Sequence, residues 1–265
     1  PTTSIRGNLF GMIGMTIAVL TTVGLIHGQA QALDVSFTSG LAWVLGALVV
    51  GGGAGTIMAK RVEMTKMPEL VAFMHSMIGL AAVFIAIAVV AEPYAFQIVA
   101  KPVDGSLAPI PVGNLLELAL GAAIGAITFS GSVIAFGKLS GKYKFRLFQG
   151  APVSFKGQHM LNLALGLLAI ALIGVFMATQ RMDVYLALVA LSFILGVLII
   201  IPIGGADMPV VVSMLNSYSG WAAAGIGFSL NNSMLIIAGS LVGSSGAILS
   251  YIMCKAMNRS FFNVI

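Results

Sequence analysis

The stretch Val184–Asp207 reads VYLALVALSFILGVLIIIPIGGAD and decides the fold class. Its first 20 residues, Val184–Ile203, carry no charged side chain, and about 20 helical residues are needed to cross a hydrocarbon core of ~30 Å. The residues Gly204-Gly205-Ala206-Asp207 then supply the chemistry of a tight turn. A second apolar segment follows at Met208–Leu230. This pattern predicts a hairpin of two membrane-spanning helices.

The composition of the whole chain agrees with that hairpin. Of the 265 residues, 59% are hydrophobic and 8% are charged, whereas a soluble domain usually carries about 25% charged residues. The mean hydropathy is +1.06. Such a chain has too little polar surface to face water everywhere, so lipid must be the solvent for much of it.

Further apolar segments lie on both sides of the hairpin. Eight segments have nearly the length of a span or more: Leu9–Ile26, Leu41–Ala59, Leu70–Ala91, Leu115–Gly137, Met160–Ala178, Val184–Ile203, Met208–Leu230 and Ser233–Met253. We therefore predict an all-α, polytopic transmembrane helix bundle of eight spans, forming a single transmembrane domain over residues 1–265. The small-residue pairs Gly51/Gly55, Gly121/Gly125 and Gly239/Gly243 favour close helix packing within it.

The basic residues indicate an orientation. With eight spans, one side of the membrane carries 11 of the 13 basic residues, and the other side carries only Lys101 and Arg181. Cytoplasmic loops are enriched in Lys and Arg, so both termini are predicted on the cytoplasmic (or matrix) side. A miscounted helix would scramble this asymmetry. The 11 are Arg6, Lys60, Arg61, Lys66, Lys138, Lys142, Lys144, Arg146, Lys156, Lys255 and Arg259.

Several function classes are excluded or disfavoured. The net charge of +5 is modest and its basic residues sit in short loops, which argues against nucleic-acid binding. The single cysteine, Cys254, excludes an internal disulfide and a cysteine-based metal cluster. The glycine-rich stretches lie inside apolar spans, so they are not dinucleotide fingerprints. The basic loop Lys138–Gln158 is interpreted as a topology signal facing anionic lipid, with a docking surface for a soluble partner as the alternative.

Sparse polar residues inside the spans are costly, and they point to function. His75 lies in the third span, where Thr65 is a plausible N-cap and Pro68 and Glu69 suit the first turn. It is eight residues beyond Met67, so it lies about 12 Å below the inner surface at ~1.5 Å per residue. Histidine is the side chain whose ordinary pKa is nearest physiological pH. We predict that His75 takes and releases a proton.

Asn216 is the second such residue. It lies eight residues beyond Met208, so it is expected at the depth of His75. Ser250 and Ser130, counted from the inner ends of their own spans, fall near the same level. We predict that these four residues form one polar layer that hosts the protonation site. The alternative for Asn216 and the serines is a set of interhelical hydrogen bonds, each worth about 0.6 kcal/mol.

Charged residues mark the inner ends of the spans. Asp207 is predicted to cap the seventh helix, a role worth roughly 1 kcal/mol, and contact with a partner or proton relay is also open to it. Lys255 and Arg259 are predicted to end the last helix, where cations suit the helix dipole. Glu117, near the outer end of the fourth span, is expected to be an exposed acid rather than a relay.

Three stretches carry a specific resemblance to a known family. They are Val62–Val71, which leads to His75, and the segments Gly204–Trp221 and Gly243–Ser260. Together they resemble the membrane domain of the β subunit of proton-translocating NAD(P) transhydrogenase, and the resemblance runs over nearly the whole chain.

That resemblance implies a function. The family transfers hydride between NADH and NADP⁺ in soluble domains and couples the transfer to proton passage through its membrane domain. The family's intramembrane histidine and asparagine fall on His75 and Asn216, and its hairpin aspartate falls on Asp207. Lys255 and Arg259 fall where the membrane domain leads into the NADP(H)-binding domain.

The resemblance also implies partners. These are the NADP(H)-binding domain of the same polypeptide, an α subunit with an NAD(H)-binding domain and its own membrane helices, and a second copy of the complex. The membrane is expected to be the bacterial cytoplasmic or the mitochondrial inner membrane. One upstream family helix and the NADP(H)-binding domain are expected outside residues 1–265. This chain alone is therefore expected to bind no nucleotide and no metal.

Two rival functions make different predictions. A stand-alone secondary transporter would favour broken helices and an inverted repeat, and the sequence shows no convincing repeat. A purely structural membrane anchor would tolerate the loss of His75 and Asn216.

Overall fold

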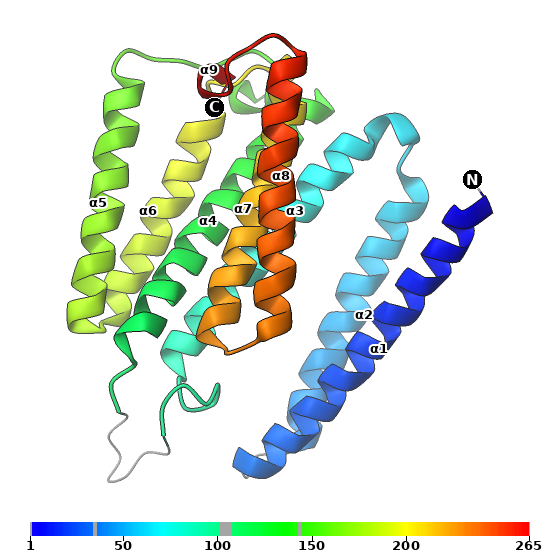
Figure 1. Cartoon of the computed structure of the whole chain (residues 1–265), viewed down its shortest axis with the longest axis vertical. Helices are drawn as coiled ribbons and strands as arrows, with labels where there is room; N and C mark the ends of the chain where they lie inside the picture. Colours follow the sequence, from blue (N-terminus) through cyan, green and yellow to red (C-terminus); the bar gives the residue numbers. More distant parts are fainter. Residues whose placement is uncertain (1, 34–35, 101–107, 143–144, 265) are drawn as a thin grey trace. The chain divides into compact units, whose positions relative to one another are not determined.

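The computed structural model describes residues 2–33, 36–100, 108–142 and 145–264, and these residues form helices and loops without a strand (Figure 1). The all-α prediction is therefore confirmed for this part of the chain. Its long helices are α1 (Thr2–Leu33), α2 (Phe37–Arg61), α3 (Met67–Ala91), α4 (Val112–Ser140), α5 (Gln158–Thr179), α6 (Met182–Ile200), α7 (Met208–Ser229) and α8 (Ser233–Ala256). Its short helices are η1 (Met64–Lys66), η2 (Arg146–Phe148), η3 (Gly205–Asp207) and α9 (Phe261–Val264).

Seven of these long helices are long and apolar enough to cross a membrane, and α7 is the exception. Its sequence includes Ser213, Asn216, Ser217 and Ser219, which lower its hydropathy. α7 packs against α3, α4 and α8, so much of its surface contacts protein rather than lipid. The chain is a multi-pass membrane protein, and the eight predicted spans correspond to the eight long helices.

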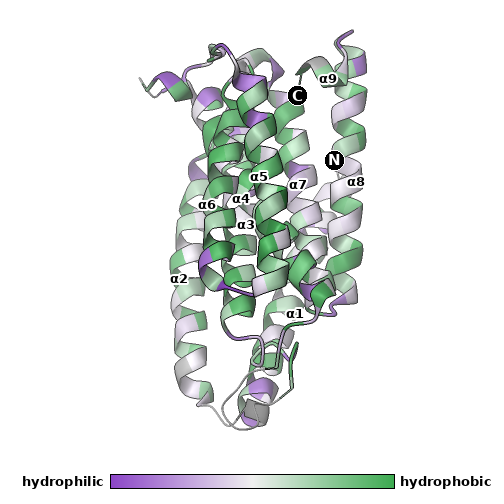
Figure 2. Ribbon diagram, turned by 90° about the vertical axis from the view of Figure 1, so that its left-hand side faces the viewer, coloured by the Kyte–Doolittle hydropathy of each residue, from purple (hydrophilic) through white to green (hydrophobic). Residues whose placement is uncertain are grey.

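The observed helix ends differ from the predicted ones. The prediction for the first helix is Leu9–Ile26, but the helix runs over Thr2–Leu33, because a helix continues past the apolar run that signals it. The sixth ends at Ile200 rather than Ile203. Pro202 accounts for this early end, since proline has no backbone N–H with which to continue the helical hydrogen bonds. Figure 2 shows hydrophobic residues along the middle of the helices and hydrophilic ones mainly in the connecting loops.

The chain divides into two compact units, Pro1–Val62 and Glu63–Ile265. In the first unit, α1 packs against α2, and large apolar side chains such as Phe10 and Trp43 are exposed. A Cβ added at Gly51 or Gly55 would meet no atom within 4 Å. Close packing at this glycine pair is therefore not seen within the described residues.

In the second unit, α4 lies between α3, α5, α6 and α7. Tyr185 of α6 is fully buried, and its hydroxyl donates to the Leu118 carbonyl of α4 at 3.0 Å. The contact between α3 and α4 is a close one, because a Cβ on Gly79 would lie 2.6 Å from the Gly125 carbonyl oxygen. Glycines on α3 and α4 thus let these two helices approach closely.

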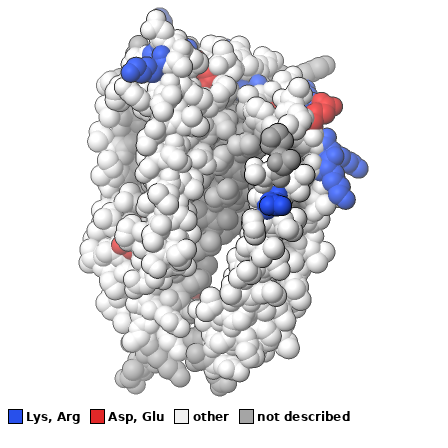
Figure 3. Space-filling model, turned by 45° about the vertical axis from the view of Figure 1, so that its right-hand side comes forward, with Lys and Arg blue, Asp and Glu red and all other residues white. Residues whose placement is uncertain are grey.

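The helices α7 and α8 meet along a second glycine seam. A Cβ on Gly239 would lie 2.6 Å from the Gly220 carbonyl oxygen, and one on Gly246 would lie 2.7 Å from the Ser213 carbonyl oxygen. The predicted packing role of Gly239/Gly243 and Gly121/Gly125 agrees with these close contacts. On the face drawn in Figure 3, most of the surface carries no acidic or basic side chain, and the few that are seen lie mainly toward one end, as expected of a surface in contact with lipid.

Candidate functional site

A hydrogen bond joins His75 of α3 to Asn216 of α7. The His75 Nε2 and Asn216 Oδ1 atoms are 2.9 Å apart. Each residue lies eight positions beyond the start of its helix, Met67 for α3 and Met208 for α7, so both are about 12 Å from that start. The two helices begin at the same end of the second unit (Figure 1). Equal depth therefore places the two side chains opposite each other.

The local sequence explains how α3 delivers His75. The 3₁₀ turn η1 precedes the helix, Lys66 occupies the N-cap position and Pro68 lies in the first turn. Thr65, the predicted N-cap, lies inside η1 instead. Lys66 Nζ donates to Glu63 Oε2 at 2.6 Å, and this hydrogen bond holds the pKa of the Glu63 carboxyl below its usual value. Because both side chains are exposed, the pair contributes little stability.

The second ring nitrogen of His75 has no partner within the described residues. His75 is only 7% exposed, and its Nδ1 atom is buried without a hydrogen bond. The adjacent Ser76 hydroxyl is occupied, because it donates to the Phe73 carbonyl at 2.6 Å. With Asn216 Oδ1 as the acceptor, Nε2 carries the proton of the neutral ring and Nδ1 holds the free lone pair. One ring nitrogen of His75, Nε2, is thus held by Asn216, and the lone pair of the other, Nδ1, has no hydrogen-bond donor among the described residues.

The two predicted serines are not hydrogen-bonded to this pair. Ser130 donates to the Ala126 carbonyl of its own helix at 3.0 Å and packs against Gly196 of α6. Ser250 donates to the Gly246 carbonyl at 2.9 Å and to the Val210 carbonyl of α7 at 3.2 Å. The structure brings His75 and Asn216 together, and it places the serines at the α4–α6 and α7–α8 contacts.

Sequence reasoning missed two serines on α7 that bind α8. Ser213 donates to the Gly246 carbonyl at 3.0 Å, and Ser217 donates to the Gly243 carbonyl at 2.5 Å. Their spacing of four residues, which puts them on one helix face, is the signal that could have found them. These bonds tie the helix that carries Asn216 to α8.

At the start of α7, Asp207 pairs with Arg259. Arg259 Nη1 lies 2.5 Å from Oδ1 and 2.6 Å from Oδ2 of Asp207. Asp207 occupies the N-cap position, but its side chain makes no capping hydrogen bond. The predicted capping bond is therefore wrong, because the carboxylate accepts from Arg259 instead. The pair is partly exposed, with side-chain exposures of 48% for Arg259 and 17% for Asp207.

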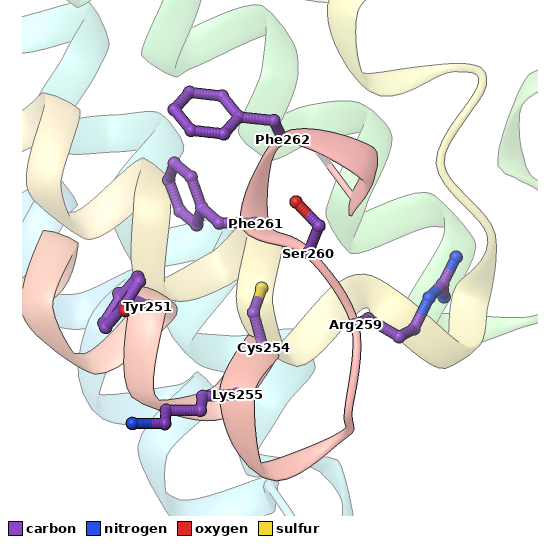
Figure 4. A pocket seen from close by; sticks show the side chains of 7 residues that line it. All are labelled: Tyr251, Cys254, Lys255, Arg259, Ser260, Phe261 and Phe262. Carbon is purple, nitrogen blue, oxygen red and sulfur yellow. The ribbon is translucent and has the colours of Figure 1, made fainter.

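The two basic residues near the end of α8 behave differently. Lys255 is in the last turn of the helix, as predicted. Arg259 is not, because α8 ends at Ala256 and Met257 is its C-cap, so the predicted dipole interaction of Arg259 is wrong. Both residues line a hollow of about 460 Å³. Figure 4 shows their side chains pointing in different directions from it. A second hollow, of about 340 Å³, lies beside Asp207 and Arg259.

Glu117 lies near the start of α4, which is at the opposite end of the second unit from the start of α7 (Figure 1). It is partly buried, so the prediction of an exposed acid is wrong. The Ser229 hydroxyl donates to its Oε2 atom at 3.3 Å. The described residues contain no group of three or more His, Cys, Asp or Glu side chains placed to hold a metal ion.

Comparisons with known proteins give one consistent result. The family model described as the NAD(P) transhydrogenase beta subunit matches residues 1–265. Two curated relatives, both named NAD(P) transhydrogenase subunit beta and both from Rhodospirillum rubrum, are 56% identical to this chain over 265 residues. The match covers 100% of this chain and 53% of each relative. The chain therefore spans about half the length of the curated relatives it matches.

Proposed function

Because this chain belongs to the family of NAD(P) transhydrogenase β subunits, we propose that it is the proton-conducting membrane domain of such an enzyme. In this proposal, hydride passes between NADH and NADP⁺ in associated soluble domains. Residues 1–265 supply the proton path that is coupled to that transfer. The observation that carries the proposal is the buried hydrogen bond between His75 and Asn216.

The pair has the chemistry of a proton carrier. The Nδ1 lone pair of His75 accepts a proton, and Asn216 holds the ring by its other nitrogen so that Nδ1 keeps one direction. A protonated imidazole in this position is a buried charge without a carboxylate bonded to it among the described residues, and such a charge is costly. The charged and neutral forms therefore favour different surroundings, and this difference is what a two-state device requires.

Helix α7 offers a route from this site to the outside of the bundle. Asn216 lies on the same helix as Met208, about 12 Å away along its axis, and Asp207 immediately precedes that helix. Movement of α7 on protonation of His75 would shift Asp207 against Arg259. By family resemblance, Arg259 lies where the chain leads toward the NADP(H)-binding domain. A change in the protonation of His75 would then reach that domain through the ion pair.

The remaining parts of the proposal rest on the family. Its partners would be the NADP(H)-binding domain of the same polypeptide and an α subunit with an NAD(H)-binding domain and membrane helices. The complex would be a dimer in the bacterial cytoplasmic or mitochondrial inner membrane. The asymmetry of the basic residues supports a cytoplasmic (or matrix) location for both termini.

The test uses the complete complex reconstituted in lipid vesicles. His75→Ala removes both ring nitrogens, and hydride transfer and internal pH are followed together. Ser76→Ala is the matched control, because Ser76 is the buried neighbour of His75 and, among the described residues, its hydroxyl bonds only within its own helix. Nucleotide binding and assembly are measured for each variant.

We expect His75→Ala to abolish the internal pH change while nucleotide binding persists, and Ser76→Ala to retain the pH change. Normal proton movement in His75→Ala would refute the assignment. His75 would then be a packing residue, and the search would move to Asp207 and Glu117.

A further inference from the structure

Lys138 is a buried cation that the proton pathway does not use. It lies in the last turn of α4, and only 4% of its surface is exposed. Its Nζ atom donates to the carbonyl oxygens of Ile201 at 2.6 Å and Ile203 at 2.7 Å, with the Ile200 carbonyl at 3.5 Å. Sequence reasoning counted Lys138 only among the basic residues that set the orientation.

These carbonyls belong to the end of α6 and to the turn that follows it. The last carbonyls of a helix lack partners within the helix, and Pro202 brings α6 to its end here. An ammonium group offers three donors, and a positive charge suits the negative end of the helix dipole. Lys138 thus binds, from another helix, the Ile201 and Ile203 carbonyls, for which no donor in the turn between α6 and α7 is found among the described residues.

Burial of the charge argues that this contact is important. A buried lysine is costly unless it is paired or well hydrogen-bonded, and no ion pair of Lys138 is found among the described residues. A lysine at a helix end could instead extend to the surface, as expected of a simple topology signal. In the structure the side chain instead points inward, and its ammonium group contacts the carbonyls at the turn between α6 and α7.

The turn between α6 and α7 is also held by backbone hydrogen bonds. Val153 N donates to the Ile201 carbonyl at 2.9 Å, and Gly205 N donates to the Gly150 carbonyl at 2.8 Å. Those bonds come from the loop after η2, whereas Lys138 comes from the central helix of the second unit. The hairpin then leads directly into Asp207, whose carboxylate pairs with Arg259.

We propose that Lys138 is a positioning residue that anchors the α6–α7 hairpin to α4 and so sets the place of Asp207 opposite Arg259. The anchoring stands on the geometry alone. Its consequence for coupling rests on the proposed function, in which Asp207 and Arg259 transmit the state of His75. If the turn is held to α4, a movement of α7 changes the geometry of the ion pair between Asp207 and Arg259. A loosely held turn would absorb that movement instead.

The first experiment measures amide hydrogen exchange of residues 201–207 in the complete complex. Lys138→Met keeps the length of the apolar stem and removes the donors, and Lys138→Arg restores a cation with donors. Lys142→Met is the matched control, because Lys142 is an exposed lysine just past the end of the same helix. Losing hydrogen bonds to a charged group corresponds to at least about tenfold in an opening equilibrium. We expect exchange at least about tenfold faster in Lys138→Met, partial recovery in Lys138→Arg and no change in Lys142→Met.

The second experiment measures protons moved per hydride transferred in vesicles. Partial unfolding alone would lower both rates together and leave this ratio unchanged. We expect Lys138→Met to lower the ratio severalfold and Asp207→Asn to lower it similarly. We also expect the double variant to fall no further, because both changes break one device.

Two results would overturn the proposal. One is unchanged exchange over residues 201–207 in Lys138→Met, which would refute the anchor whatever the proton pathway is. The other is faster exchange with a normal proton ratio, or additive losses in the double variant, which would refute the link to Asp207. His75→Ala is assayed alongside, so that failure of the proposed proton site is recognised separately.

Discussion

The contact between α3 and α4 allows a sharp test of how the His75 site is built. A Cβ on Gly79 would lie 2.6 Å from the Gly125 carbonyl oxygen and 2.7 Å from the Phe129 backbone nitrogen. Both atoms belong to the backbone, so no side-chain rotation can relieve the clash in Gly79→Ala. Ordinary contact begins at 3.4 Å, so the two helices must separate locally by about 0.8 Å. Overpacking of this kind costs about 1–3 kcal/mol.

The separation of α3 from α4 should also disturb the hydrogen bond between His75 and Asn216. Gly79 lies four residues after His75, on the same face of α3. Because α7 packs on α4 as well as on α3, moving α3 outward also draws it away from Asn216. A shift of the full 0.8 Å would lengthen the 2.9 Å bond between His75 and Asn216 to about 3.7 Å. A contact that long is no longer a hydrogen bond.

We expect Gly79→Ala to lower the melting temperature of the complex by several degrees and to reduce proton movement in vesicles. Gly166→Ala on α5 is the control, because no atom lies within 4 Å of the new Cβ. Alanine favours a helix over glycine by up to about 1 kcal/mol, so this control should be neutral or slightly more stable. The reasoning is refuted if Gly79→Ala melts and moves protons like the unchanged protein.

Two further predictions concern the residues that α7 presents. Asn216→Leu keeps similar volume but removes the acceptor from His75 Nε2, and we expect at least about a tenfold slower internal pH change. Unaltered kinetics would show that the bond does not orient the ring. Asp207→Asn removes one charge from a partly exposed ion pair with Arg259, so the free energy of unfolding should change by no more than about 1 kcal/mol. Its proton-to-hydride ratio should nevertheless fall, and a large loss of stability with a normal ratio would contradict this.

The fold could be predicted from the sequence where it depends on lipid. An uncharged run such as Val184–Ile203 has few alternatives to a spanning helix. The ends of the helices could not be predicted as well, because polar residues continue a helix once it has left the apolar layer. α7 is recognisable by its turn and its length rather than by its hydropathy, which falls below that of a simple span.

For the site, the sequence predicts only how deep each residue lies along its helix. Counting residues from the two helix starts assigns His75 and Asn216 the same depth, and their side chains are hydrogen-bonded. The same count places Ser130 and Ser250 at that level, but depth does not say which neighbour a helix face meets. Ser130 faces α6 and Ser250 faces α7. The inward turn of Lys138 was hidden for the same reason, since a lysine at a span end fits the surface equally well.

In the proposed function, the low hydropathy of α7 is itself part of how the site would work. Ser213 and Ser217 bind α8 carbonyls, Asn216 binds the α3 histidine, and the first residue of α7 follows the ion-paired Asp207. A helix with so many polar groups is held in a bilayer by its protein neighbours, because lipid offers no hydrogen bonds. A change at one of those neighbours, such as protonation of His75, therefore alters the balance of contacts that fixes the whole helix. An apolar helix surrounded by lipid has no such hydrogen bonds, so protonation of a neighbouring side chain would not change its position in this way.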